Sequence, residues 1–409
     1  MLDYQKMALA MKDEVAGWRH QFHSHPELSY QEENTTKRIV EILREIGYEN
    51  IRVGVPHCPN SGVTVDLNPG KPGRCIALRA DIDALPVTEE TGLEYASQEP
   101  SVMHACGHDS HISMLLGAAK LLYQIRDQVP GNVRFIFQPG EESTEPLFQK
   151  WGAQLVTEGS GWMDGVDAAF ALHAWGTLPT GVIHYTPGPF MTANMVARMK
   201  VCGVGGHGAM PHTCVDPVVI ACQIVTAWQT IVSRETDPLN VAVVTVTDIE
   251  AESTGAFNVI PPSVSLVVGV RTYNEELMDT VARRMEEIAR GIATGMRAEI
   301  EFSAEKGVPP VVNDPTFTER AAKAIRKAVG KDHITKTSPV APSEDFAWYL
   351  KKVPGALMFL GVGDAEKGTN YAQHHPKFNV DDDAMPVGIA SLAAVACDYL
   401  AGAEEPEGE

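Results

Sequence analysis

MHACGHDSH (residues 103–111) is followed at once by ISMLLGAAKLLYQI (residues 112–125). The second stretch is apolar and predicts a buried helix, which places the first stretch where a strand passes into that helix. Cys106 therefore lies between His104 and His108 just before a helix begins. One interpretation is a polar loop with a chance cysteine. The other is a metal site that uses a thiolate and an imidazole, and the choice depends on where further ligands lie.

Strands alternate with helices in the first part of the chain. Apolar strands are expected at 61–67, 74–82, 132–139 and 168–175, with helices at 8–25, 35–48 and 112–125. This alternation predicts an α/β domain with a largely parallel sheet and helices on both faces. In such sheets, ligands bind at the carboxyl ends of the strands. Five polar residues fall where strands end: Asp81, Asp83, Glu141, Glu142 and His173.

The pattern changes between residues 189 and 305. Strands and helices there follow the order β-α-β-β-α-β, which is typical of a ferredoxin-like unit. After this unit the α/β pattern resumes. We therefore expect residues 1–188 and 306–409 to form one discontinuous catalytic, metal-binding domain, with residues 189–305 inserted as a lid and dimerisation domain.

Composition restricts the classes of function. The 409 residues carry a net charge of -20, which disfavours nucleic acids and anionic membranes as partners. No secretory signal is visible, no apolar run approaches the ~20 residues that span a bilayer, and the ending GAEEPEGE is typical of a solvated tail. The seven cysteines are scattered without disulfide-scaffold spacing, so we expect a cytoplasmic protein with reduced thiols.

Further polar residues extend the candidate metal site. A lone histidine such as His173, or an adjacent carboxylate pair such as Glu141 and Glu142, is by itself a weak signal. Together the candidates give five ligands on one edge of one sheet: Cys106, His108, Glu142, His173 and His374. Five ligands suit two ions that share a bridging ligand, or one ion with an adjustable shell. Thiolate and imidazole favour zinc, whereas carboxylates keep manganese or nickel possible.

Motifs along nearly the whole chain carry a resemblance to a known family. They are WRHQFHSHPELSYQE, ALRADIDALPV, MHACGHDSHISMLLGAA, FIFQPGEE, ALHAW, GVGGHGAMPH, FNVIPPSVSLVVGVRT, PSEDFAWYL and HHPKFNVDDDAMPVG. Through them the chain resembles the metal-dependent amidohydrolase family of aminoacylases, carboxypeptidase G and plant auxin-conjugate hydrolases, specifically the auxin-conjugate hydrolase branch. The inserted lid agrees with the arrangement of that family.

The resemblance implies a role for each candidate residue. It makes Cys106 the thiolate that bridges two metal ions, and it makes Glu141 the general base that activates water and then protonates the leaving amine. The remaining metal ligands that it implies are His108, Glu142, His173 and His374.

The resemblance also assigns three residues of the lid. His207 is expected to stabilise the tetrahedral oxyanion, in its own subunit or from a partner subunit of a homodimer or higher oligomer. Asn258 and Arg271 resemble the pair that grips the substrate carboxylate. For Arg271, which follows the apolar strand SVSLVVGV, an internal salt bridge remains the alternative.

These roles predict hydrolysis of the amide bond of an N-acylated or N-aroylated amino acid, a small molecule with a free carboxylate. Deamination of an aryl amine by the same activated water, or cleavage of small peptides, remains an alternative. A non-catalytic protein with a structural metal site is disfavoured, because such a site needs no base like Glu141. Asp81 and Asp83 are expected to orient ligands. His104, His111 and His375 are expected to support the ligands or to be structural.

Overall fold

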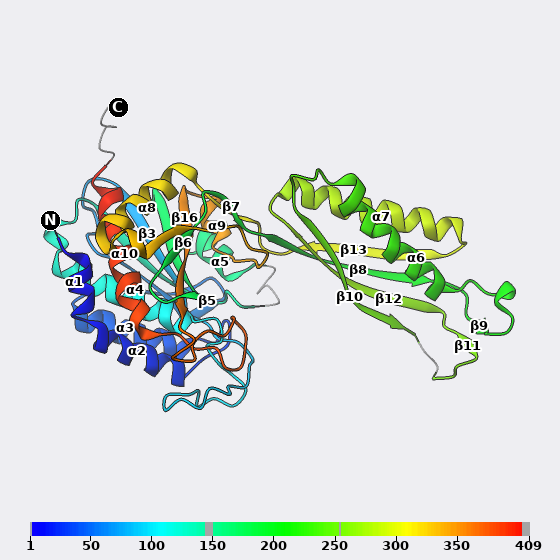
Figure 1. Ribbon diagram of the computed structural model, residues 1–409, viewed down its shortest axis with the longest axis horizontal. Coiled ribbons are helices and arrows are strands. Elements are labelled where there is room, and N and C mark those ends of the chain that lie inside the picture. The colour runs from blue at the N-terminus through cyan, green and yellow to red at the C-terminus, as the bar shows by residue number, and fades with distance from the viewer. Residues whose placement is uncertain (1, 144–149, 253–254, 403–409) are drawn as a thin grey trace. The chain divides into compact units, whose positions relative to one another are not determined.

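The computed structural model describes residues 2–143, 150–252 and 255–402, so most of the acidic tail lies outside the described residues. The chain forms two compact units, which we describe separately (Figure 1). The first unit comprises Met1–Gly188, Val312–Ser338 and Asp345–Glu409, and the second comprises Pro189–Val311 and Pro339–Glu344. The second unit thus begins at residue 189 but ends at Val311 rather than at 305. It also includes a later segment, 339–344, that no sequence pattern indicated.

One eight-stranded sheet forms the centre of the first unit, in the order β1-β2-β4-β3-β5-β16-β6-β15. The strands are β1 (Arg52–Val55), β2 (Cys58–Asp66), β3 (Cys75–Asp81), β4 (Asn132–Gln138), β5 (Ala168–Pro179), β6 (Ile183–Tyr185), β15 (Ile334–Lys336) and β16 (Gly355–Gly363). Strands β4, β3, β5 and β16 are parallel, as the alternating pattern predicts. Strands β1 and β2 are added antiparallel at one side, and β6 pairs antiparallel with β16 at the other.

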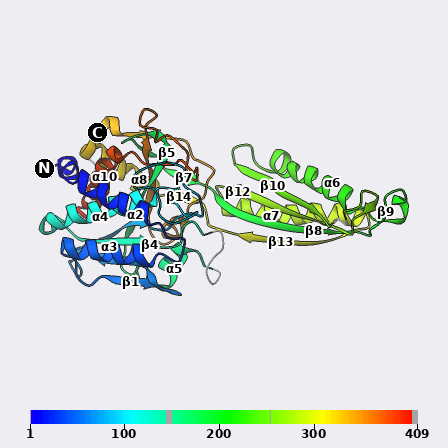
Figure 2. The same cartoon turned by 90° about the horizontal axis from the view of Figure 1, so that it is seen from below.

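Helices cover this sheet in the first unit (Figure 2). They are α1 (Tyr4–Leu9), α2 (Lys12–Ser24), α3 (Glu33–Ile46), α4 (His108–Gln124), α5 (Gly152–Gly159), α8 (Pro315–Val329), α9 (Ala347–Leu350) and α10 (Met385–Leu400). Helices α4 and α10 contact the central strand β3 and each other, while α3 contacts β2 and α8 contacts β16. The strands β3 and β4 are buried along their whole length, which explains their apolar composition.

Helix α10 is the most apolar helix of the first unit. The segment Asp382–Leu400 is long and apolar enough to span a membrane by length and composition alone, although no such run was expected from the sequence. However, 78% of that segment is buried inside the protein, where α10 packs against α4 and α8. These contacts are those of a core helix in a folded domain.

The second unit has the expected β-α-β-β-α-β order. Its elements are β8 (Ala193–Cys202), α6 (Pro217–Thr230), β10 (Ala242–Ala251), β12 (Ser263–Thr272), α7 (Glu275–Gly295) and β13 (Glu299–Lys306). The four strands form an antiparallel sheet in the order β10-β12-β8-β13. Both helices pack on this sheet, and Nε1–H of Trp228 in α6 donates to the Met285 carbonyl oxygen in α7 at 2.9 Å.

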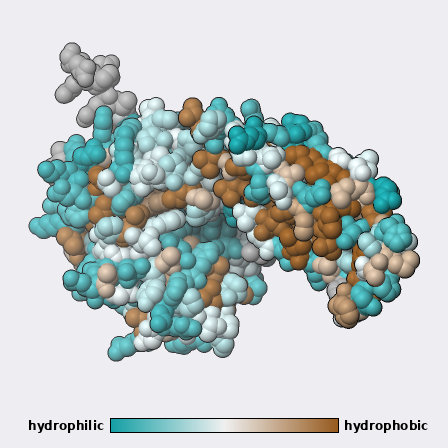
Figure 3. Space-filling model, turned by 45° about the vertical axis from the view of Figure 1, so that its right-hand side comes forward, coloured by the Kyte–Doolittle hydropathy of each residue, from teal (hydrophilic) through white to brown (hydrophobic). Residues whose placement is uncertain are grey.

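Two short strands extend the second unit beyond its main sheet. Strand β9 (Gly206–His207) pairs with β11 (Val259–Ile260) at one tip of the unit (Figure 1). Strands β7 (Gly188–Met191) and β14 (Val311–Asn313) lie where the chain passes between the units. Apolar side chains are also exposed on this unit, where they form brown patches in Figure 3. The exposed apolar residues of this unit include Val218 and Val219 on α6 and Val243 and Ile249 on the edge strand β10.

Candidate metal centre

The cysteine loop ends in a left-handed glycine, after which α4 begins. Gly107 has φ 88°, a conformation that residues with a Cβ atom adopt only with strain. A Cβ atom at this position would also lie 3.1 Å from Cβ of Ala174 and 3.3 Å from Cζ of Phe378. Cys106 and His108 are therefore held on either side of a tight turn, and both are buried.

The structure brings together all five metal ligands expected from the sequence. Cys106 and His108 flank the turn before α4, Glu142 follows β4, His173 lies in β5 and His374 follows β16. Sγ of Cys106 lies 3.6 Å from Nε2 of His173. Oε1 of Glu142 lies 3.7 Å from Nε2 of His108 and 3.5 Å from Nε2 of His374.

The ligand atoms form two triads that share Sγ of Cys106. One triad is Cys106, His108 and His173, and the other is Cys106, Glu142 and His374. Within each triad the candidate ligand atoms all lie within 4.8 Å of one another. Cys106 thus occupies the position that a ligand bridging two ions requires.

Unpaired buried atoms test whether these residues fit metal ions. Nε2 of His108 and Oε1 of Glu142 are buried, and neither has a hydrogen-bond partner among the described residues. Buried polar atoms are nearly always paired, so these two require a partner such as a cation. A donor set of one thiol, three imidazoles and one carboxylate suits zinc and other divalent transition metals. The residues therefore fit a pair of divalent ions.

The protonation of the innermost ligands follows from their surroundings. Burial lowers the pKa of His173 well below its usual value, so its imidazole is neutral. Its Nδ1–H donates to the Ala174 carbonyl oxygen at 2.7 Å, which leaves Nε2 available towards Cys106. Burial and the carboxylates of Glu142 and Glu141 raise the pKa of the Cys106 thiol. A bound cation would reverse that shift, because it stabilises the thiolate.

His108 is surrounded by carboxylates that orient it. Its Nδ1–H donates to the Asp83 carbonyl oxygen at 3.0 Å, and its Nε2 lies 3.5 Å from Oδ2 of Asp81. Burial disfavours a charged ring, but Asp81, Asp83 and Glu142 together raise the pKa of His108 to about 10. The Asp83 carboxylate also accepts the backbone N–H of Glu142 at 2.8 Å. This acidic surrounding favours positive charge, which divalent ions supply.

His111 supports the site without belonging to either triad. Its Nε2 accepts the backbone N–H of Ala174 at 2.7 Å, so its proton is on Nδ1 and is donated to Asp81 at 2.5 Å. The ring therefore fixes the backbone beside His173. His104 is buried and outside both triads, and His375 stacks on Tyr371 with ring centroids 4.7 Å apart.

Glu141 lies beside a buried ionic cluster. Its Oε1 accepts the backbone N–H of Asp345 at 3.3 Å. The Asp345 carboxylate accepts from Arg79 at 2.8 Å, from the amide of Gln138 at 2.9 Å and from the backbone N–H of Ala153 at 2.8 Å. Arg79 also pairs with Asp81 at 2.7 Å. Sequence analysis missed Arg79 and Asp345, although an arginine inside the apolar strand ALRADI was a usable signal.

A second buried arginine connects the segments around His108 and His374. Nη1 of Arg19 donates to Asp109 at 3.1 Å, and Nε donates to Asp382 at 2.5 Å. Asp109 follows His108 directly, and Asp382 follows the loop that contains His374. His374 itself has φ 65°, a strained value for histidine, and its backbone N–H donates to the Ala105 carbonyl oxygen at 2.7 Å. The last ligand is thereby attached to the cysteine loop.

The candidate residues of the second unit form two groups. His207 in β9 and Asn258 beside β11 are both exposed, and the backbone N–H of Gly208 donates to the Asn258 carbonyl oxygen at 2.7 Å. Arg271 lies near the other end of β12, where its Nη1 donates to Oγ of Ser343. From Ser263 to Arg271 the strand rises about 26 Å, at about 3.3 Å per residue. The unit therefore brings His207 and Asn258 together but not Asn258 and Arg271.

Arg271 has no anionic partner in the part of the chain that the structure describes. Its Nη1 donates to the neutral hydroxyl of Ser343, and no carboxylate of residues 2–143, 150–252 or 255–402 pairs with it. Burial lowers the pKa of its guanidinium. The described residues therefore do not supply the internal salt bridge that was the alternative interpretation.

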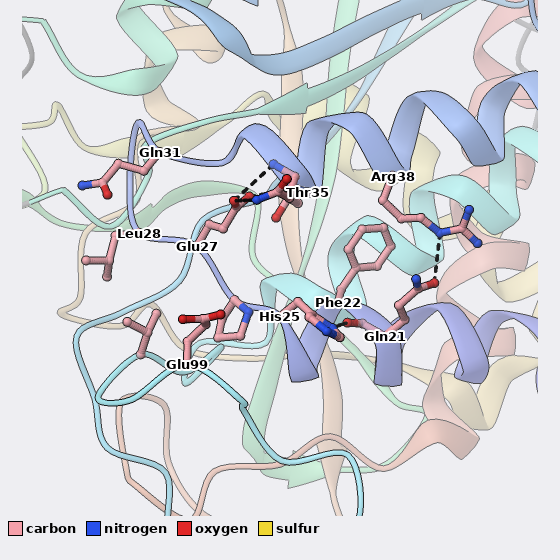
Figure 4. A pocket seen from close by; sticks show the side chains of 12 residues that line it. Gln21, Phe22, His25, Glu27, Leu28, Gln31, Thr35, Arg38 and Glu99 are labelled. Carbon is pink, nitrogen blue, oxygen red and sulfur yellow. Dashed lines mark hydrogen bonds between the residues drawn. The ribbon is translucent and has the colours of Figure 1, made fainter.

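A separate cavity of about 530 Å³ lies between the end of α2 and the start of α3 in the first unit (Figure 4). Polar side chains that line the cavity form hydrogen bonds that connect α3 to α2 and to the segment between the two helices. The Glu27 carboxylate accepts the backbone N–H of Thr35 at 2.8 Å, and Nε–H of Arg38 donates to Oε1 of Gln21 at 2.9 Å. None of the residues expected to form the active site lines this cavity.

Comparisons with known proteins agree with this geometry. The model of peptidase family M20/M25/M40 matches residues 77–398. An N-acetylcysteine deacetylase of Bacillus subtilis is 38% identical over 388 residues, covering 95% of this chain and 97% of the relative. An IAA-amino acid hydrolase ILR1-like 2 of Arabidopsis thaliana is 35% identical, covering 96% and 88%. The crystal structure of the Bacillus subtilis YXEP protein, a dinuclear metal-binding peptidase of the M20 family, superposes with a TM-score of 0.82 at 35% identity, covering 96% of this chain and 99% of that one.

The buried Glu32 gives a prediction for stability. Burial and the nearby Asp83 raise the pKa of Glu32 to about 8, and Oε1 of Glu32 accepts the backbone N–H of Gly140 at 2.8 Å. The folded protein therefore holds a proton that the unfolded chain releases above about pH 4.5. Wild-type stability should fall as pH rises from 5 to 8, by up to about 1.4 kcal/mol per pH unit from this residue.

Glu32→Gln removes this pH dependence, because glutamine does not titrate. The free energy of unfolding of the variant, relative to that of wild type, should therefore increase as pH rises. The measurement is denaturant unfolding at pH 5, 6, 7 and 8. Glu33→Gln, at the exposed neighbouring position, is the matched control and should track the wild type. A constant difference between Glu32→Gln and wild type across this range would show that Glu32 is ionised in the folded protein.

Cys106 gives a prediction for metal content. Cys106→Ala removes the atom common to both triads, so it should reduce bound metal and activity together. Cys202→Ala, which alters a partly buried cysteine of the second unit, should reduce neither. Metal content is measured by elemental analysis after dialysis. Full metal occupancy with unchanged affinity in Cys106→Ala would exclude the bridging role.

Proposed function

Since this chain belongs to peptidase family M20/M25/M40, and is therefore a metal-dependent hydrolase, we propose that it hydrolyses the amide bond of N-acyl or N-aroyl amino acids. The observation that supports this most directly is the Glu141 carboxylate, which lies within 4.8 Å of the candidate ligand atoms of His108 and Glu142. A carboxylate that adjoins the ligands without joining either triad is suited to proton transfer. A purely structural metal site has no use for it.

The proposed reaction uses the chain's own groups for proton transfer and charge stabilisation. Bound divalent ions would supply Lewis acidity, polarising the scissile carbonyl and lowering the pKa of water. Glu141 accepts a proton from the attacking water as the new C–O bond forms. It returns that proton to the amine nitrogen as the C–N bond breaks, releasing a carboxylic acid and an amino acid. His207 is proposed to stabilise the oxyanion, an interaction worth about 3 kcal/mol when one donor is removed.

Arg271 is proposed to select substrates that have a free carboxylate. Its guanidinium is partly buried, and no described acidic residue neutralises it. A carboxylate can accept two parallel N–H hydrogen bonds from a guanidinium. A lysine ammonium in place of the arginine could not donate this pair of bonds, and a neutral amide in place of the substrate carboxylate could not accept it. This favours amino-acid conjugates over simple amides.

The metal ions, the cellular location and the excluded classes of partner are also proposals. We propose two ions per chain, zinc or manganese, with nickel as a further possibility, because the donor set combines thiol, imidazole and carboxylate. We propose a cytoplasmic location because all seven cysteines are free. We propose no role for nucleic acid or membrane, in keeping with the net charge of -20.

A homodimer is proposed from the separation of residues within the second unit. His207 and Asn258 lie at one tip, whereas Arg271 lies near the far end of β12, about 26 Å from Ser263 by strand rise. A second copy could supply the tip residues to a site that contains Arg271. The edge strand β10 and the uncharged α6 expose apolar side chains suited to pairing between copies.

The substrate class is tested with a panel of N-acyl amino acids, aryl amines and dipeptides, using the zinc- and manganese-loaded protein. We expect carboxylic acid and amino acid as products, with Glu141→Gln slower by about 10³-fold or more while it still binds metal. Ammonia as the product would favour deamination. Near-normal turnover by a metal-loaded Glu141→Gln would remove Glu141 as the base.

Mixing two inactive variants tests the homodimer. His207→Ala retains Glu141, and Glu141→Gln retains His207. If His207 acts in the partner subunit, each mixed dimer regains one intact site of two, so a random equal mixture should recover about one quarter of wild-type activity. No recovery, in a mixture shown by mass spectrometry to contain mixed dimers, would place His207 and Glu141 of the same subunit in one site.

A further inference from the structure

The segment Pro339–Glu344, which we call the strap, belongs to the second unit although the first unit flanks it on both sides. The backbone N–H of Val340 donates to the Phe190 carbonyl oxygen at 2.9 Å, and that of Thr192 donates to the Pro342 carbonyl oxygen at 3.0 Å. Near its end, Oγ of Ser343 accepts from Nη1 of Arg271. The strap is therefore attached to the residue that we propose to bind the substrate carboxylate.

Asp345, the first residue after the strap, is fixed in the first unit. Its carboxylate is buried and accepts hydrogen bonds from Arg79, Gln138 and the backbone of Ala153. Its backbone N–H donates to Oε1 of Glu141, the proposed general base, at 3.3 Å. Because Ser343 and Asp345 are two residues apart, about 7 Å of extended chain at most separates their Cα atoms.

The bond from Asp345 to Glu141 is formed but long. Backbone N–H bonds to oxygen are usually about 2.9–3.0 Å, and catalytic hydrogen bonds in ligand-free proteins often tighten when substrate binds. A displacement of a few tenths of an ångström in the Asp345 peptide would therefore change how firmly Glu141 is held. The side chain of Asp345 cannot provide this change because its own partners fix it. The peptide that joins it to the strap can.

We propose that Asp345 is a positioning residue for Glu141, and that the strap transmits carboxylate binding at Arg271 to the Asp345 N–H. A carboxylate that engages Arg271 acts on Ser343 through Nη1, and the Ser343–Asp345 backbone passes the effect to Glu141. The carboxylate of the substrate thereby contributes to kcat and not to binding alone. This inference rests on the proposed function, since it presupposes Arg271 as the carboxylate site and Glu141 as the base.

The first test measures amide hydrogen exchange at Asp345 with residue resolution. The full-length, metal-loaded chain is used with an N-acyl amino acid analogue in which CH2 replaces the amide NH, so that the ligand binds without being hydrolysed. With the free acid of this analogue, the Asp345 amide should exchange at least about fivefold more slowly, which is the lower end of typical coupling between sites. The matching carboxamide of the analogue should leave exchange unchanged. Unchanged exchange at saturating acid would overturn the inference.

The second test uses steady-state kinetics of the metal-loaded enzyme. It distinguishes failure of this inference from failure of the proposed function. Ser343→Ala removes the hydroxyl that connects Arg271 to the strap, so kcat for the acid should fall about threefold to thirtyfold with KM nearly constant. The kcat for the carboxamide should not change. Ser265→Ala, an exposed serine of β12, is the matched control and should behave as wild type.

The outcomes are distinct. If wild type hydrolyses the acid and Ser343→Ala has the same kcat, the inference fails and the proposed function stands. If Ser343→Ala raises only KM, Ser343 serves carboxylate binding alone, and the inference fails again. If wild type hydrolyses acid and carboxamide equally well, or hydrolyses neither, the proposed substrate recognition fails and the inference fails with it.

Discussion

The buried guanidinium of Arg79 is the interaction on which the candidate metal centre depends. It pairs with Asp81 at 2.7 Å and with Asp345 at 2.8 Å, and all three side chains are almost fully buried. Asp81 lies against the candidate ligand His108, and the backbone of Asp345 contacts Glu141. One cation therefore fixes both the metal side and the base side of the site. Loss of this guanidinium would leave the buried carboxylates of Asp81 and Asp345 without their shared cation, and breaking a buried ion pair typically costs about 3–5 kcal/mol.

Buried arginines solve a general problem in this acidic chain. The ligand residues come from segments that are distant in sequence, and each segment carries carboxylates that repel one another. Arg19 joins Asp109 to Asp382, which are 90 and 363 residues away from it. Arg79 reaches Asp345 across 266 residues. Each arginine neutralises carboxylates at the place where two segments meet. The same hydrogen bonds therefore compensate the buried charges and hold the distant segments together.

The sequence was informative wherever the decisive pattern was local. Alternating strands and helices predicted the parallel centre of the first sheet, and GVGGHG and FNVIP marked residues that the short β9–β11 pair brings together. The candidate ligands could be proposed because their residue types have few other reasons to follow buried strands. The strap and Asp345 were not identifiable, because their placement depends on contacts with Thr192 and Arg79 far along the chain. The separation of Asn258, which precedes β11, from Arg271, near the far end of β12, likewise required the strand register.

The two donor triads differ in access to water, and this difference has a kinetic consequence. The triad of Cys106, His108 and His173 is buried throughout, whereas in the other triad the side chain of His374 is 54% exposed. An ion in the second position could leave by rotation of one surface imidazole, whereas release from the first would require opening of the protein interior. Preparations exposed to chelators would then lose one equivalent quickly and the other slowly, leaving chains that retain half their metal.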